Sequence, residues 1–304
     1  MTDQFESGRD ARRQLSPGTR GCHDPVCGAL ILVAVAGYVF LGLHWLRPLD
    51  FVLWLVFSLL AGLPGWAAWL ALRGMPALRR VEFWAGGVIM GWAFTSYALL
   101  VVGYLAGKVV LWPLWVLAGV SVIGIIFGVR RSGAARLPGV ESWDRGSRRV
   151  LAFAAAVVIV FIARPFWSVG TLTPDGYAFP WLFGFDFTNR VSIAANVAVS
   201  LPPKYFHIHG ETFHYYLLTY LFPVAFKKLA GGSAEMFAAL LMWCVNLAVA
   251  FTIILVWALR DVARNSRVLL LSVLTSLAAY SFYWVYVAAK VYAREGVRVH
   301  SIAR

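Results

Sequence analysis

The sequence predicts an all-α polytopic membrane protein with about seven transmembrane helices (seven or eight) and one large external loop that contains interfacial helices. The first observation is composition: 61% of the 304 residues are hydrophobic, 13% are charged, and the mean hydropathy is +0.73. Soluble domains are about half apolar and about a quarter charged. The second is that several apolar segments reach the roughly 20 residues needed to cross a hydrocarbon core of about 30 Å. The third is that arginine is concentrated in alternate loops.

Seven segments have the length and apolar character of a membrane-spanning helix. The expected spans are Pro25 to Leu46, Phe51 to Leu72, Val81 to Ala106, Val109 to Val129, Arg149 to Ser168, Met236 to Leu259 and Val268 to Ala289. The apolar run that begins near Pro25 is too long for the core of a signal peptide and lacks a small-residue cleavage site. We therefore expect the first helix to be retained.

The basic charge indicates membrane topology rather than nucleic-acid binding. The chain has 27 Lys and Arg against 14 Asp and Glu, a net charge of +13. Most arginines fall in the N-terminal tail and in the loops near 73–80 and 130–149, whereas the loops between these contain only Arg47 and Lys108. By the positive-inside rule the N-terminus is cytoplasmic and the loop 169–232 is external. We expect a bacterial plasma (inner) membrane.

The run from Phe213 to Phe226 is apolar but too short to be a clear span. It has fourteen residues and contains Pro223, and runs of 10 to 14 apolar residues are more often interfacial or re-entrant. If it does not cross, the span that begins at Met236 runs inward and places Arg260 in the cytoplasm. We expect a helix that begins near Thr212 and does not span; the alternative gives eight spans.

This reading divides the chain into five parts. They are a cytoplasmic polar tail (1–24), a four-helix bundle (25–129), a basic cytoplasmic linker (130–148), a region with one span, the external loop 169–232 and two further spans (149–289), and a tail (290–304). The CHDPVC segment places Cys22, His23 and Cys27 close together, but there is no second half-site in the sequence, which favours incidental thiols over zinc. No metal ligand is assigned.

The external loop contains the carboxylates of interest. Asp175 and Asp186 lie among aromatic residues, and 186–203 has the spacing of an amphipathic interfacial helix that stops at Pro202 and Pro203. Its polar face is expected to carry Asp186, Asn189, Ser192, Asn196 and Ser200. Its apolar face is expected to carry Phe187, Val191, Ala194, Ala195 and Ala198. Asp186 is expected in the first turn, either as a cap paired with Arg190 or as a general base or metal ligand.

The order of these features resembles the C-type glycosyltransferase superfamily over residues 149–289. A span is followed by an external loop whose acidic residue opens an interfacial helix, then by a Pro-Pro stop, a glycine, a tyrosine pair and an inward span that ends in arginine. The residues that carry the resemblance are Asp186, Leu201, Pro202, Pro203, Gly210, Tyr215 and Tyr216.

The resemblance implies transfer of a sugar from a polyprenyl-phosphate carrier to an acceptor at the external membrane face. It implies Asp186 as the carboxylate near the acceptor, with Asp175 in reserve. Phe187 follows Asp186 where the family has an acidic pair, so a divalent cation stays an open alternative and no cofactor is assigned. Members of the family continue through further spans, and we expect this sequence to be truncated or part of a split protein.

A polar and aromatic stretch lies beside the expected carrier site. Its residues are Lys204, His207, His209, Glu211, His214, Tyr215 and Tyr216. The lysine and histidines could hold a phosphate by charge and hydrogen bonds, and the tyrosines could line the lipid path or stack on a sugar. Tyrosines also form the aromatic belt of most membrane proteins, and a His-x-His pair with Glu211 could instead bind zinc.

A second class of function stays open. A non-catalytic multi-pass subunit, or a transporter of lipid-linked or envelope precursors, would share this composition. A transporter should show ionisable groups in mid-membrane or paired broken helices, and the spans contain only Asn246, Pro64 and Pro113 as signals of that kind. The expected partners are therefore a polyprenyl-phosphate-linked sugar and membrane lipids, and no nucleic acid.

Overall fold

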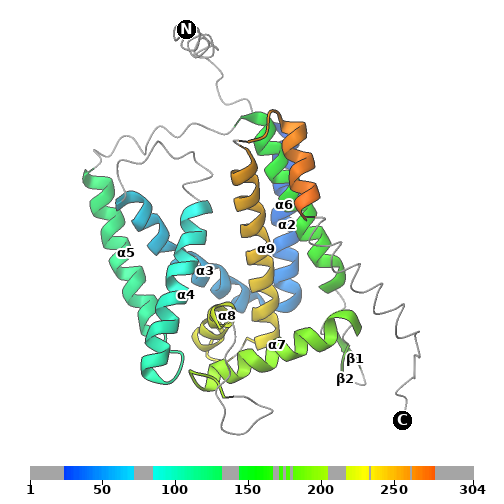
Figure 1. Ribbon diagram of the computed structural model, residues 1–304. Helices are drawn as coiled ribbons and strands as arrows, with labels where there is room; N and C mark the ends of the chain where they lie inside the picture. The colour runs from blue at the N-terminus through cyan, green and yellow to red at the C-terminus, as the bar shows by residue number, and fades with distance from the viewer. Residues whose placement is uncertain are drawn as a thin grey trace, which may run out of the picture.

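The fold is a bundle of helices with one short hairpin, seen in a computed structural model (Figure 1). The structure describes residues 24–71, 85–131, 144–166, 171–173, 176–178, 181–204, 217–232, 234–260 and 262–277. The helices are α2 (Pro25–Trp45), α3 (Pro48–Ala71), α4 (Gly87–Ala106), α5 (Trp112–Arg131), α6 (Arg145–Phe166), α7 (Trp181–Val199), α8 (Leu218–Leu229) and α9 (Met236–Arg260). A further helix covers Ser266–Leu277. The all-α class is confirmed for the described part of the chain.

Four helices in the described ranges are long and apolar enough to cross a membrane: α2, α3, α4 and α9. They establish a multi-pass membrane protein. Within the residues that the structure describes, two further apolar helical stretches, Trp112–Gly128 and Ser266–Leu277, are shorter than these four. The total of about seven spans is therefore not shown and stays a prediction.

Prolines and one glycine mark several helix boundaries. Pro25 and Pro48 are the first residues of α2 and α3, where the missing N–H costs nothing because the first turn of a helix leaves its donors without partners. Helix α4 ends at Gly107, whose φ of +69° lies in the left-handed region. Glycine reaches that region without steric cost, which allows the tight turn into α5.

The long helices pack in two groups that the order of the sequence does not suggest. Helices α3, α4 and α5 pack together, whereas α2 packs mainly against α6, which also packs against α9. Figure 1 shows the two groups side by side, with α8 between them near one end. This packing does not test the division of the chain into five parts. It does show that α2, which ends at Trp45, pairs with α6, which begins only at Arg145.

A polar network ties the two groups together inside the bundle. The hydroxyl of Tyr38 on α2 donates to Oδ1 of Asn246 on α9 at 2.8 Å, and Nε1 of Trp54 on α3 donates to the same hydroxyl at 3.0 Å. Asn246 and Trp54 are buried. Hydrogen bonds between helices at this depth stabilise membrane proteins by about 0.6 kcal/mol each on average.

Most of the described arginines outside α7 gather at one end of the bundle, which we call the basic end; Arg47, which follows α2, and Arg164, near the end of α6, lie toward the other end. Nε of Arg145 and Nε of Arg149, at the start of α6, donate to Oδ2 of Asp24 at 2.9 and 2.7 Å. The hydrogen bonds from Arg149 and Arg145 hold the pKa of the Asp24 carboxyl well below its usual range. Arg260, at the end of α9, acts electrostatically on Asp144 at the same end.

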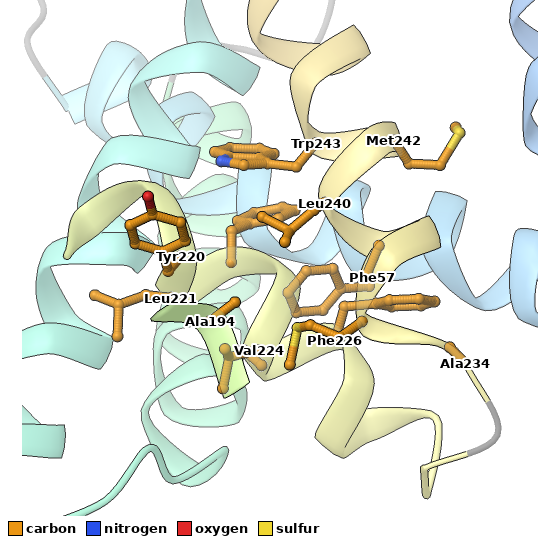
Figure 2. Close-up of a cluster of buried hydrophobic side chains, with 14 of the residues drawn as sticks. Phe57, Ala194, Tyr220, Leu221, Val224, Phe226, Ala234, Leu240, Met242 and Trp243 are labelled. Carbon is orange, nitrogen blue, oxygen red and sulfur yellow. The ribbon is translucent and has the colours of Figure 1, made fainter. Parts of the chain in front are cut away.

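Helix α8 lies in the interior of the protein and does not span it. Twelve residues at about 1.5 Å each give about 18 Å, short of the hydrocarbon core of about 30 Å. All seven residues from Tyr220 to Phe226 are buried, and Figure 2 shows Tyr220, Val224 and Phe226 packed among side chains of neighbouring helices. The expected start near Thr212 is wrong for this helix, which begins at Leu218; residues 205–216 lie outside the described part.

Aromatic contacts fix α8 in place. The rings of Phe57 and Phe222 have centroids 4.5 Å apart, those of Trp54 and Phe226 lie 4.9 Å apart, and Phe222 stacks on Trp243 at 4.0 Å. Such pairs stabilise by about 0.5–1.5 kcal/mol beyond the area that they bury. A short helix that contains Pro223 is therefore held by α3 and α9 rather than by its own propensity.

Candidate functional site

The end opposite the basic end, which we call the loop end, carries the hairpin, α7 and the end of α8 (Figure 1). Strands β1 (Thr171–Thr173) and β2 (Gly176–Ala178) pair antiparallel, with Leu172 opposite Tyr177. The sequence analysis did not predict this hairpin. Asp175 lies between the strands and outside the described residues.

Helix α7 begins five residues earlier than the sequence analysis predicted. It starts at Trp181, so its first turn contains no acidic residue and Asp186 lies in the second turn. The expectation of a first-turn Asp186 is wrong. Pro180 directly precedes Trp181, and a proline at a helix start is the sequence signal for this boundary. The side chain of Asp186 is outside the described part.

Arg190 lies on the face of α7 that packs into the protein. Ile193, Ala194, Val197 and Leu201 are buried, and Arg190, half-buried, continues their spacing of three to four residues toward the start of the helix. Ser192 is exposed, as expected, but Ala195 is exposed as well, which corrects its expected place on the apolar face. The buried face of α7 is therefore centred on Ile193 and Val197 rather than on the alanines, because larger side chains bury more apolar area than alanine.

Arg190 lies near α9. Its guanidinium lies within electrostatic range of the Cys244 thiol on α9, and α7 packs on both α8 and α9. A guanidinium is always charged and presents five donors in a planar fork. The arrangement therefore places a strong anion-binding group at the junction of α7 with the bundle.

The end of α7 is anchored to the turn between α4 and α5. The helix stops at Val199, as the Pro202 and Pro203 stop predicted. The N–H of Leu201 donates to the carbonyl of Gly107 at 2.9 Å, and the Leu201 side chain lies so close to Gly103 that a Cβ there would be 2.6 Å from its Cδ1. Lys204, which follows, is exposed.

Two lysines that the sequence analysis did not select meet near the same turn. Nζ of Lys228, at the end of α8, donates to the carbonyl of Val109 at 2.8 Å. Partial burial lowers the pKa of Lys228, and the positive charge of Lys108 lowers it further. Only the tertiary contact between α8 and the α4–α5 turn reveals this pair; the sequence signal was a basic dipeptide, Lys227 and Lys228, closing an apolar helix.

The remaining predicted site residues are not tested. His207, His209, Glu211, His214, Tyr215 and Tyr216 lie outside the described residues. Within the described ranges there is no group of three His, Cys, Asp or Glu side chains that could hold a metal ion. Of the proposed binding residues, Arg190 and Lys204 both lie at the loop end, on either side of the segment that anchors α7.

Comparison with known proteins adds no relative. No protein-family model matches the chain, and neither the curated proteins nor the solved structures contain a match. The findings establish a helical protein with four candidate membrane-spanning helices in the part of the chain that the structure describes. The likeness to C-type glycosyltransferases stays a hypothesis that rests on the residues of this sequence.

Proposed function

We propose that this protein is a membrane glycosyltransferase that moves a sugar from a polyprenyl-phosphate carrier to an acceptor at the external face of the membrane. Asp186 activates or orients the acceptor hydroxyl. Arg190, Lys204 and the histidines of the segment 205–216 steady the departing phosphate. Asp175 serves as the reserve carboxylate, and membrane lipids and the carrier are the partners.

The observation that carries the proposal is the place of Arg190. A half-buried guanidinium on the inner side of α7 lies four residues after Asp186, at the junction with α9. Charge builds on a phosphate as it leaves, and preorganised cations in a partly water-excluded site stabilise that charge most strongly. An arginine at this position therefore supports a site for an anionic leaving group where α7 meets the bundle.

The other cations of the loop end support the same chemistry. Lys204 is exposed beside the α7 anchor, and Lys108 and Lys228 repel each other near the same turn. The side chain of Lys108 makes no hydrogen bond or ion pair with any residue in the described ranges, and an anion would relieve its repulsion of Lys228. A phosphate group accepts charge-assisted hydrogen bonds from such ammonium groups.

The position of Asp186 sharpens its role. A residue in the second turn cannot cap the helix, because the N-cap precedes the first turn. The structural alternative is an ion pair with Arg190 one turn later, which stabilises an exposed helix by only about 0.2–0.5 kcal/mol. A placed carboxylate that takes the proton from a hydroxyl contributes on the order of 10²–10⁴-fold in rate.

The experiment is sugar transfer by the purified protein in vesicles with labelled polyprenyl-phosphate sugars. Asp186→Asn should lower the transfer rate at least 100-fold, with normal expression and thermal stability, because an amide keeps the shape but cannot accept the proton. Asp175→Asn should be milder. Ser192→Ala, on the exposed side of α7, is the matched control and should transfer at the wild-type rate.

Full turnover by Asp186→Asn would refute the catalytic assignment. If transfer is lost in Asp186→Asn but retained in Arg190→Gln, Asp186 is the base and Arg190 does not stabilise the leaving phosphate. A wild-type protein that transfers no sugar from any carrier tested would favour the non-catalytic subunit.

A further inference from the structure

Two lysines from distant parts of the chain meet at the turn between α4 and α5. Lys108 belongs to this turn, and Lys228 is the last residue but one of α8. Nζ of Lys228 donates a hydrogen bond to the carbonyl of Val109, the residue that follows Lys108, at 2.8 Å. The structure therefore brings two like charges together at one turn.

Neither lysine has a counter-ion among the residues that the structure describes. Within those ranges the Lys108 side chain is exposed and makes no hydrogen bond or ion pair, and the Lys228 ammonium uses one of its three donors. Partial burial and the charge of Lys108 lower the pKa of Lys228, and no described carboxylate opposes them. Like charges repel, and an anion shared by the two ammonium groups would replace this repulsion with attraction.

A cap on α8 does not require this pair. Lys227 shows the local alternative, because its Nζ donates to the carbonyl of Ala234, in the connection from α8 to α9, at 3.2 Å. Lys228 instead donates to a different segment, and Lys108 lies outside α8 altogether. The positive-inside rule predicts few cations at the loop end, which we expect to be external. The two lysines therefore call for a further reason.

The pair lies at the level of the lipid headgroups. Helix α4 has 20 residues, about 30 Å, which matches the hydrocarbon core. It ends at Ala106, two residues before Lys108, at the loop end of the bundle (Figure 1). Leu105, in its last turn, is 84% exposed, and Val101 and Trp112 are exposed as well. A lipid that covers Leu105 therefore has its headgroup beside Lys108.

The chemistry of this surface selects an anionic phospholipid. Phosphate oxygens accept charge-assisted hydrogen bonds from ammonium groups. A zwitterionic lipid carries an ammonium group of its own, which the two lysines repel, whereas a lipid of net negative charge leaves its phosphate free to contact both. A free phosphate ion would leave Leu105 without apolar cover.

We propose that Lys108 and Lys228 bind the phosphate of one anionic phospholipid, whose acyl chains lie along Leu105 and Val101 of α4. The lipid stays bound and connects the α4–α5 turn to the end of α8. The inference goes beyond the proposed sugar transfer, to which Arg190 and Lys204 are assigned. It holds whether or not the protein transfers a sugar.

Binding of the first lipid to the purified full chain tests the proposal. Native mass spectrometry compares dioleoyl phosphatidylglycerol with dioleoyl phosphatidylcholine, which differ only in the headgroup. The wild type should bind the phosphatidylglycerol more tightly, by about fivefold or more. Lys108→Met removes one charge from an exposed side chain and should weaken phosphatidylglycerol binding about fivefold, the factor that about 1 kcal/mol per lysine near an anionic lipid gives. Its binding of phosphatidylcholine should not change.

Arg47→Met is the matched control. Arg47 is an exposed cation toward the same end of the bundle, in the connection between α2 and α3, and its removal should leave phosphatidylglycerol binding as it is in the wild type. An equal loss in Arg47→Met and Lys108→Met would mean general attraction to a charged surface and would overturn the site. Equal binding of the two lipids by the wild type would overturn it as well.

Thermal unfolding in detergent with added lipid gives a second readout. Because a ligand of the folded state raises the unfolding midpoint, phosphatidylglycerol should raise the midpoint of the wild type above that in phosphatidylcholine, and Lys108→Met should lose this gain. Lys228→Met covers the case in which Lys108→Met does not fold, and should lose the gain too. A gain that persists in both variants would refute the lysine pair. Displacement of the phosphatidylglycerol by excess inorganic phosphate or by excess polyprenyl phosphate would assign the pair to a soluble anion or to the sugar carrier instead.

Discussion

For Arg190 and Lys228, the contacts of a single charged side chain depend on its position in the fold. Both are half-buried cations at the loop end. The charge of Arg190 acts on Cys244 of α9, and Lys228 donates a hydrogen bond to the α4–α5 turn. Lys228 lies at the end of an otherwise buried helix, where an ammonium also interacts favourably with the negative end of the helix dipole. Its hydrogen bond to the Val109 carbonyl connects α8 to the group formed by α3, α4 and α5.

Replacing Lys228 should weaken this connection. Lys228→Met removes the hydrogen bond to the Val109 carbonyl, and we expect a loss of roughly 1 kcal/mol in the free energy of unfolding. Lys108→Met removes only the like charge that lowers the pKa of Lys228, so its stability should equal or exceed that of the wild type. Thermal unfolding in detergent measures both. A larger loss in Lys108→Met than in Lys228→Met would contradict this account.

At the scale of elements, the tightest contact joins α3 and α4 through glycine. A Cβ on Gly65 would overlap the carbonyl oxygen of Gly87, and one on Gly91 would overlap the carbonyl oxygen of Gly62. These partners are backbone atoms, which cannot move aside as a flexible side chain can. Small residues let two membrane helices approach closely enough for extensive van der Waals contact.

Gly91→Ala should therefore separate α3 from α4. We expect a loss of about 3 kcal/mol, the upper end of the usual range for overpacking, because the new methyl group meets backbone. Gly119→Ala on α5 is the matched control: no atom lies within 4 Å of its added Cβ, and alanine favours the helix, so its stability should be unchanged or slightly raised. Thermal unfolding of both variants decides, and equal stabilities would refute the close contact.

For the whole molecule, the two ends of the bundle differ in what they carry. Arg145, Arg149 and Arg260 lie at the basic end. The hairpin, α7 and the end of α8 lie at the loop end (Figure 1), whose described cations include Lys108 and Lys228. The positive-inside rule concerns arginine and lysine close to the membrane. We propose that the basic end faces the cytoplasm, because the arginine-rich loop 130–149 of the sequence leads into α6 at this end.

Cysteine labelling with a membrane-impermeant reagent tests this orientation in intact cells. In a background without the natural cysteines, Ala178→Cys on β2 should be modified from outside, and Arg264→Cys, after α9, only once the membrane is permeabilised. The expected contrast is near-complete against near-zero modification. The reverse pattern would invert the topology and move the candidate site to the cytoplasmic face.

The sequence by itself determined the solvent in which the chain folds and several of its boundaries. Low charge and long apolar runs identify membrane helices without reference to any partner, and Pro202 and Pro203 stop α7 through local geometry. Only the tertiary structure decided that α2 pairs with α6, that α8 is enclosed by the bundle, and that Arg190 lies near α9. The reason is that membrane helices such as α2 are apolar on all sides, so their sequences do not mark the face that packs. Helices far apart in the chain pack where their side chains fit each other, and this fit can be seen only when the helices are placed side by side.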